Sequence, residues 1–90
     1  MQVEWDPSKA IANLKKHGVT FEEAFTVLTQ VGTVTFYQED PSEDRWVSMG
    51  YSAAGRLLLV VYCERKSNLI RIISARRATS RERKDYEEGI

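Results

Sequence analysis

The chain has 90 residues, of which 42% are hydrophobic and 29% charged, and its 13 basic and 13 acidic side chains leave no formal net charge. This length and composition predict one folded domain over residues 1–90 and argue against a disordered protein. A single cysteine, Cys63, excludes an intrachain disulfide and a cysteine-based zinc site, and neither a secretory signal nor an apolar run long enough to span a bilayer is present, so we expect a cytoplasmic protein that does not bind membranes.

Opposite charges are separated along the sequence. Residues 1–44 carry three basic and eight acidic side chains, whereas residues 45–84 carry ten basic and two acidic ones. Surface charges of both signs are ordinarily interspersed. The segregation therefore predicts a basic face that meets an anionic partner, unless the fold interleaves the two halves in space.

The first part of the chain predicts a strand followed by two helices. Asp6 and Pro7 are typical of a helix start, and Gly18 is typical of the residue that ends one. Thr20 and Glu23 have the spacing of a capping box at the start of a second helix. We expect a short strand at 2–5 and helices at about 7–17 and 21–30, joined in a corner that packs against a sheet.

The second part reads as strands and a final helix. Runs rich in β-branched and aromatic residues occur at 33–38, 45–51, 56–63 and 68–75, separated by short polar turns, which predicts an antiparallel meander. The run 56–63 has no polar alternation and is expected to be the central strand. Thr79 and Glu82 repeat the capping-box pattern before a C-terminal helix. The predicted fold class is α+β, with the order β-α-α-β-β-β-β-α.

Six basic residues surround the junction between the last strand and the last helix: Arg71, Arg76, Arg77, Arg81, Arg83 and Lys84. Strict alternation along the strand would put Arg76 on one face and Arg71 and Arg77 on the other. An unpaired Arg71 is costly to bury, so it either finds a carboxylate partner, of which Glu64 on the neighbouring strand is the nearest candidate by sequence, or reaches an open surface.

Basic side chains at a helix N-terminus oppose the helix dipole. Free N–H groups together with arginine side chains suit phosphate oxygens, so their placement predicts a phosphate site at the junction, against the alternative of a solvated charged face.

The order WD..K...N..KHGV.FEEA, R....G and IRIISARRAT..ER..Y resembles the BrnT family of type II toxins, small bacterial ribonucleases with a RelE-like fold. The matching positions are Trp5, Asp6, Lys9, Asn13, Lys16, His17, Gly18, Phe21, Glu22, Ala24, Arg45, Gly50, 70–79, Glu82, Arg83 and Tyr86. The segment TVLTQ at 26–30 departs from the family, in which a phenylalanine and an aspartate are expected there.

The resemblance implies a toxin that cleaves RNA and thereby inhibits translation. The implied targets include ribosome-associated mRNA. Its implied partner is a BrnA-like ribbon-helix-helix antitoxin, which forms a heterotetramer with the toxin and represses its own promoter, so that DNA is bound only through the antitoxin. The implied mechanism is attack of the ribose 2′-OH on the adjacent phosphate without a metal.

One histidine and one cysteine cannot assemble a zinc site, so no metal or other cofactor is expected. Charge stabilisation then has to come from cationic side chains. The catalytic candidates are Arg71, Arg76, Arg77, Glu64, His17 and Tyr86, and the phosphate-binding candidates are Lys16, Arg65, Arg81, Arg83 and Lys84. His17 could instead simply complement the dipole of the first helix.

Two rival hypotheses use the same basic residues. One is a non-catalytic adaptor that holds nucleic acid or protein, and the other is an inactive family member retained as a co-repressor. Binding and cleavage of RNA both require arginines, so the sequence separates these readings weakly.

Overall fold

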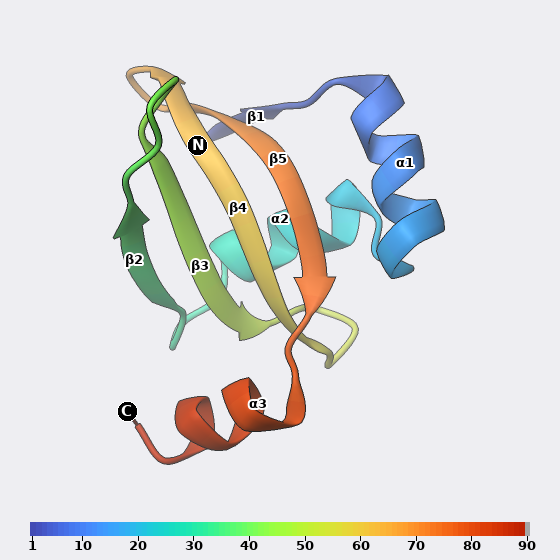
Figure 1. The fold of residues 1–90 in the computed structure, drawn as a ribbon, viewed down its shortest axis with the longest axis vertical. Helices are drawn as coiled ribbons and strands as arrows, with labels where there is room; N and C mark the ends of the chain where they lie inside the picture. Colours follow the sequence, from blue (N-terminus) through green and yellow to red (C-terminus); the bar gives the residue numbers. More distant parts are fainter. Residues whose placement is uncertain (90) are drawn as a thin grey trace.

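The computed structural model describes residues 1–89, which form five strands and three helices in the predicted order (Figure 1). The elements are β1 Gln2–Glu4, α1 Pro7–His17, α2 Phe21–Leu28, β2 Val34–Gln38, β3 Arg45–Tyr51, β4 Leu57–Lys66, β5 Leu69–Arg77 and α3 Ser80–Glu87. The α+β class is confirmed. The second helix ends two residues earlier than expected, and the last two strands are longer than expected because a tight turn joins Lys66 to Leu69, with Asn68 at a φ of 66°.

The sheet has the strand order β1-β5-β4-β3-β2. Strands β2 to β5 pair antiparallel, as the meander prediction required, and β4 lies at the centre as expected. The strand expected at 2–5 adds to this meander as a parallel edge, because β1 pairs with the first residues of β5, from Gln2 opposite Leu69 to Glu4 opposite Arg71. The sheet is therefore mixed.

Helix α1 begins and ends where its capping residues predict, and α2 begins where its own predict. The Asp6 carboxylate accepts a hydrogen bond from the Ser8 N–H at 2.8 Å, and Gly18 ends α1 in the left-handed conformation with a φ of 70°. The Thr20 hydroxyl accepts from the Glu23 N–H at 3.1 Å. Figure 1 shows α2 behind the sheet and α1 beside β5.

Buried side chains form a cluster on each face of the sheet. The larger cluster lies between the helices and the sheet and contains Val19, Phe21, Ala24, Val27, Leu58, Val60, Ile72 and Ala75. The smaller one consists of Met49, Leu57 and Leu59, with Val47, Ala78 and Tyr86 packed around it. Consecutive residues of β4 are thus buried on opposite faces, as expected of a central strand.

An irregularity in β5 changes which side chains share a face. Val61 pairs with Ser74 but Tyr62 pairs with Ile72, so that Ile73 has no partner on β4. Cross-strand partners point to the same face. Strict alternation is therefore wrong across this point.

Ile72 shares the helix-covered face with Ala75, although their separation is an odd number of residues. Arg71, which pairs with Cys63, lies on the same face as Ser74 and Arg76. The irregularity thus turns both apolar halves of β5 toward the helices.

The C-terminal helix lies across the lower end of the strands in Figure 1. Both halves of the predicted capping box are formed, since the Thr79 hydroxyl accepts from the Glu82 N–H at 3.1 Å and the Glu82 carboxylate accepts from the Thr79 N–H at 2.8 Å. The Tyr86 hydroxyl donates to the Gly32 carbonyl at 2.6 Å and so fastens α3 to the segment before β2.

Candidate active site

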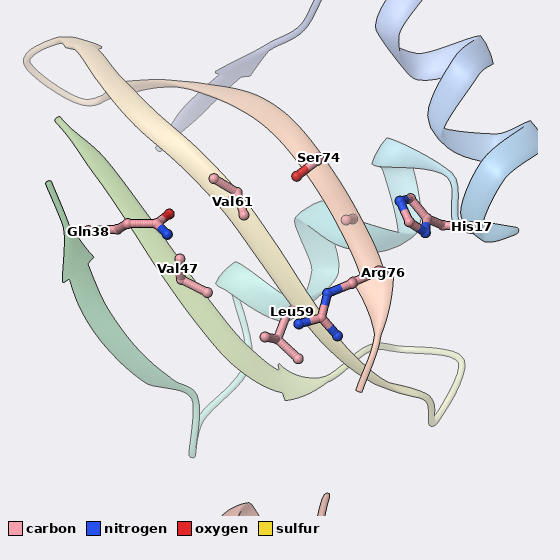
Figure 2. A pocket seen from close by; sticks show the side chains of 8 residues that line it. His17, Gln38, Val47, Leu59, Val61, Ser74 and Arg76 are labelled. Atoms are coloured by element: carbon pink, nitrogen blue, oxygen red, sulfur yellow. The ribbon is translucent and has the colours of Figure 1, made fainter. Parts of the chain in front are cut away.

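A pocket of about 290 Å³ lies on the face of the sheet opposite α2. Figure 2 shows the side chains that line it. They come from the end of α1 and from β2 to β5, and are His17, Gln38, Val47, Leu59, Val61, Ser74, Ala75 and Arg76. The floor is apolar, whereas the end next to α1 carries an imidazole, a hydroxyl and a guanidinium.

A second, shallower hollow of about 220 Å³ adjoins the first. It lies between α1 and β5 and is lined by Lys9, Ala12, Asn13, Lys16, His17, Ile73 and Ser74. His17 and Ser74 line both hollows, which together form one groove that crosses β5. We refer to the two hollows as the β5 groove. Its α1 side carries two lysines that form no ion pair within residues 1–89.

Asn13 fixes the position of α1 against β5. Its side-chain Oδ1 accepts from the Ala75 N–H at 3.1 Å, and its Nδ2 donates to the Ala75 carbonyl at 2.9 Å and to the Val19 carbonyl at 3.0 Å. β1 pairs only with the first residues of β5, so the buried Asn13 amide supplies the bonds that a neighbouring strand would make at Ala75. This contact sets the wall of the groove.

His17 lies one helical turn after Asn13 and is the last residue of α1. Its side chain is half-buried and reaches toward β5 in Figure 2. Within residues 1–89 the imidazole takes part in no hydrogen bond with another side chain or with the backbone. Its position at the helix C-terminus complements the dipole, and its position in the groove leaves both ring nitrogens available to a ligand.

Arg76 is held by Glu82 in a way that leaves donors available. Its Nη1 and Nη2 each donate to a Glu82 carboxylate oxygen at 2.8 Å, and Nη1 also donates to the Arg77 carbonyl at 3.2 Å. A guanidinium has five N–H donors. The Nε–H and the second N–H of Nη2, which lie side by side on one edge of the group, therefore stay available to a ligand oxygen.

The pairing keeps the Glu82 carboxylate ionised to lower pH than usual. Hydrogen bonds from the Arg76 guanidinium are the largest cause that lowers the pKa of the Glu82 carboxyl to about 2, and the Thr79 N–H adds to the effect. The same contact raises the pKa of the Arg76 guanidinium. The ion pair therefore persists well below neutral pH. Glu82 holds the guanidinium of Arg76, whose side chain reaches over β4 toward Leu59 in Figure 2.

Arg71 lies at the other end of β5. Its Nε donates to the Glu4 carboxylate at 2.8 Å, and Glu4 is its partner in the parallel pair of β1 and β5. The hypothesis that Arg71 pairs with Glu64 is wrong. Glu64 pairs with Ile70 in the sheet, so these two side chains point to the same face, whereas Arg71 points to the opposite one.

The basic residues of the strand-to-helix junction do not converge, contrary to the sequence prediction. Arg77 pairs with Leu58, on the face that the helices cover. The hydrogen bonds from Arg56 are the main cause that lowers the pKa of the Glu23 carboxyl, and the charge of Arg77 makes a smaller contribution. Arg81 and Lys84 lie on the far side of α3 in a hollow of their own, and the Arg83 guanidinium reaches the Tyr51 hydroxyl at 3.5 Å. Only Arg76 of the six lines the β5 groove.

Three further predicted residues also lie elsewhere. Glu64 and Arg65 line a hollow near the β4–β5 turn, and Arg65 is 3.7 Å from Glu43. Tyr86 has its hydroxyl bonded to Gly32 and its ring 5.8 Å from that of Tyr51. The structure thus brings together His17, Lys16 and Arg76 of the predicted set.

The charge segregation seen in the sequence is partly neutralised in the fold. Five of the six ion pairs within residues 1–89 join an acidic residue before position 45 to an arginine from position 45 onward: Arg45–Asp40, Arg45–Glu43, Arg56–Glu23, Arg65–Glu43 and Arg71–Glu4. These pairs engage four of the ten basic residues of 45–84, so the fold interleaves the two halves in part, and a basic face formed by the remaining residues stays a prediction.

Sequence reasoning missed several residues of the groove. Ser74 and Gln38 are absent from the candidate set, and Lys9 and Asn13 appear there only as positions of the family resemblance. The sequence signal that could have found Lys9 and Asn13 is their helical spacing with Lys16 and His17, which puts all four near one side of α1. No local pattern marks Gln38, because β2 is brought beside the groove by sheet pairing alone.

Among residues 1–89 there is no group of three or more His, Cys, Asp or Glu side chains placed to hold a metal ion. The helices of this part of the chain are too short or too polar to cross a membrane.

Residues 5–82 match the model of a family described as the ribonuclease toxin BrnT of type II toxin–antitoxin systems. The chain belongs to the BrnT family. It is therefore a ribonuclease toxin of a type II toxin–antitoxin system, a class with an endoribonuclease activity and a cognate antitoxin, as the resemblance in its sequence implied.

The fold is similar to that of a solved member of this family. The crystal structure of the Brucella abortus ribonuclease toxin BrnT matches with a TM-score of 0.73 and 24% sequence identity, over 89% of this chain and 99% of the other. This likeness supports the fold. No curated protein matches the sequence.

Proposed function

We propose that this BrnT toxin cleaves RNA in the β5 groove by attack of the ribose 2′-OH on the adjacent phosphate, without a metal, and that this cleavage inhibits translation. In this reaction the bond from phosphorus to the 2′-oxygen forms while the bond to the 5′-oxygen breaks. The products are a cyclic phosphate and a 5′-hydroxyl. RNA supplies the nucleophile, so the protein needs to position the phosphate, stabilise its charge and transfer protons.

The observation that carries the proposal is the free edge of the Arg76 guanidinium in a groove that His17 also lines. Two parallel N–H donors match two phosphate oxygens, and Glu82 holds them in place before the substrate arrives. Lys9 and Lys16 on the α1 side add positive charge along the path of the RNA backbone.

His17 is assigned to proton transfer. It is the only imidazole in the chain. The Asn13 contacts hold its helix, α1, against β5, and His17 lines both hollows of the groove together with Ser74. Its ring can take the proton of the 2′-OH as the new bond forms, which is the role a positioned base plays in this class of reaction. Neither Glu64 nor Tyr86 lies within the groove.

The test compares purified wild type with His17→Gln and Arg76→Lys in cleavage of total RNA with EDTA present. We expect His17→Gln to lower the cleavage rate by about 10²-fold or more, the usual contribution of a general base. Arg76→Lys, which loses the paired donors, should lose on the order of 10²-fold. Arg71→Lys provides the comparison, and its loss should be smaller because its guanidinium binds Glu4.

Several outcomes would contradict this proposal. A wild-type chain that leaves RNA intact with or without EDTA would disprove the activity, and cleavage only after metal is added would disprove its metal independence. Equal activity of the three variants would place the chemistry outside the groove. Translation is measured in parallel in a cell-free system supplied with intact or stripped ribosomes.

We also propose that the cognate antitoxin is a ribbon-helix-helix protein, whose dimer holds two toxins in a heterotetramer and carries the promoter-binding activity. The support is membership of a type II family together with the sequence resemblance. Coexpression of the toxin with the protein encoded beside it, followed by mass measurement of the purified complex, should give two copies of each chain. A complex with a different ratio would contradict this assembly.

A further inference from the structure

The end of the pocket farthest from His17 has a different chemistry from the phosphate end. Val47, Leu59 and Val61 of β3 and β4 form an apolar floor there, and Gln38 of β2 stands at the edge of that floor. The pocket thus runs from a cationic end at Arg76 over an apolar surface to a neutral amide.

The Gln38 amide is available to a ligand. In Figure 2 the side chain extends from β2 over β3 toward Val61. Within residues 1–89 its side-chain oxygen and nitrogen make no hydrogen bond with the protein. Phe36, two residues earlier and therefore on the same face, pairs with Val47 and is 44% exposed, so an aromatic side chain lies beside the floor.

We propose that this end of the pocket binds one nucleobase of the RNA substrate and that Gln38 contacts its hydrogen-bonding edge. The inference rests on the proposed function, because it takes the phosphate to be held at Arg76. Bases of single-stranded RNA are recognised by stacking on flat apolar or aromatic groups and by hydrogen bonds to their edges, and both are present here. The volume of about 290 Å³ is at the lower end of the range for ligand pockets, which favours one nucleotide unit.

The chemistry of an amide predicts how specificity can be changed. An amide offers both a donor and an acceptor, so it can pair with the edge of each base by rotating. A carboxylate is an acceptor only. Guanine presents two adjacent donors, N1–H and N2–H, whereas adenine presents one donor beside an acceptor. Gln38→Glu should therefore shift preference toward guanine.

The first measurement is binding, kept separate from cleavage. The ligands are four short oligonucleotides with 2′-O-methyl groups, which remove the nucleophile, differing only in one base within a uniform sequence, and the base is moved along the strand in successive sets. With the full chain carrying Gln38→Glu, we expect the guanine-to-adenine affinity ratio to rise on the order of tenfold at one position of the strand, the discrimination given by one well-formed bidentate contact.

Three further variants accompany this experiment. Gln30→Glu makes the same chemical change at an exposed residue that does not line the pocket and should leave the ratio unchanged. Phe36→Ala should weaken binding of all four oligonucleotides by a similar factor, on the order of tenfold, because stacking is insensitive to base identity. Gln38→Leu, which keeps the size but removes both polar atoms, should flatten any preference of the wild type.

The second measurement is cleavage of the same sequences as ordinary RNA. A base preference that follows Gln38 in both measurements supports the inference. An unchanged guanine-to-adenine ratio in Gln38→Glu at every position overturns it, whatever the cleavage rates. Base-dependent binding that follows Gln38 in a chain that cleaves no RNA supports the base subsite while the proposed function fails, so the two failures are distinguishable.

Discussion

The Glu82 carboxylate both caps a helix and binds an arginine. It caps the first turn of α3 through the Thr79 N–H and also binds both terminal nitrogens of Arg76. The orientation of the arginine therefore depends on the helix start, and the helix start depends on the arginine. A carboxylate that serves two positively polarised groups stays ionised to low pH.

Glu82→Gln tests this double role through the pH dependence of stability. The pKa of Glu82 is about 2 in the folded chain, below the ordinary 4.5, so the carboxylate stabilises the fold above about pH 4.5 and this contribution is lost as the pH falls toward 2. We expect the variant to be less stable at pH 7 by on the order of 1 kcal/mol, since solvent screens the pair. Urea unfolding of both proteins should show this difference reduced to about half or less at pH 3. An equal difference at both pH values would contradict the assignment.

At the scale of elements, the contact between α1 and β5 is the one that assembles the groove. β5 has a strand neighbour on each side only at its start, and beyond Arg71 the Asn13 side chain takes the place of β1. His17, Lys16 and Lys9 are carried by the same helix. Their position relative to Arg76 thus depends on one buried amide.

Asn13→Leu should destabilise the chain strongly. The leucine has a similar size but leaves the N–H and carbonyl of Ala75 and the carbonyl of Val19 without their partners, at about 1–3 kcal/mol for a buried group left unsatisfied. We expect a loss of about 3 kcal/mol in the free energy of unfolding, measured with urea, and Asn13→Asp should also destabilise because it keeps only the acceptor. Stability within about 0.5 kcal/mol of wild type would show that the amide is dispensable.

Elements with local signals were predictable from the sequence, and those that depend on distant pairing were not. Capping residues marked the ends of α1 and the starts of α2 and α3, and alternation and turns marked the meander. The parallel pairing of β1 joins residues such as Glu4 and Arg71 from opposite ends of the sequence, so no local pattern contains it.

The candidate site shows the same division. Arg76 and His17 were named from the sequence because their residue types suit phosphoryl chemistry, and Lys16 because it adjoins His17 in the family pattern. Arg71 and Arg77 were grouped with Arg76 by proximity along the chain. Distance in sequence is a poor guide once a strand irregularity and an ion pair to another strand intervene.

For the whole molecule, folding pairs some of the positive charge and leaves Lys9 and Lys16, within residues 1–89, unpaired beside the groove where RNA is proposed to bind. The ion pairs between the two halves of the sequence neutralise arginines on the rest of the sheet. Lys9 and Lys16 of α1, although they belong to the acidic half of the sequence, border the β5 groove. Binding should therefore depend on few phosphate contacts.

The salt dependence of RNA binding measures those contacts. Each phosphate neutralised on a single strand adds about 0.7 to the slope of log affinity against log salt concentration. Lys9→Gln and Lys16→Gln should each reduce the slope of 2′-O-methyl RNA binding by about 0.7 if the lysine meets one phosphate. Lys66→Gln, at the turn between β4 and β5, should leave it unchanged. A slope that is the same in all variants would show that RNA follows another path.

The unpaired residue at Ile73 makes the length of β5 as important as its composition. Because the strand changes face there, the isoleucines before it and the alanine after it are both buried, while Arg71, Ser74 and Arg76 all point away from the helices. Removing Ile73 would restore regular alternation and leave Ile72 and Ala75 on the same face, because each residue of β5 would then have one partner on β4. Deletion of Ile73 should consequently keep the same side chains buried, whereas insertion of a further residue would turn one half of β5 to the opposite face.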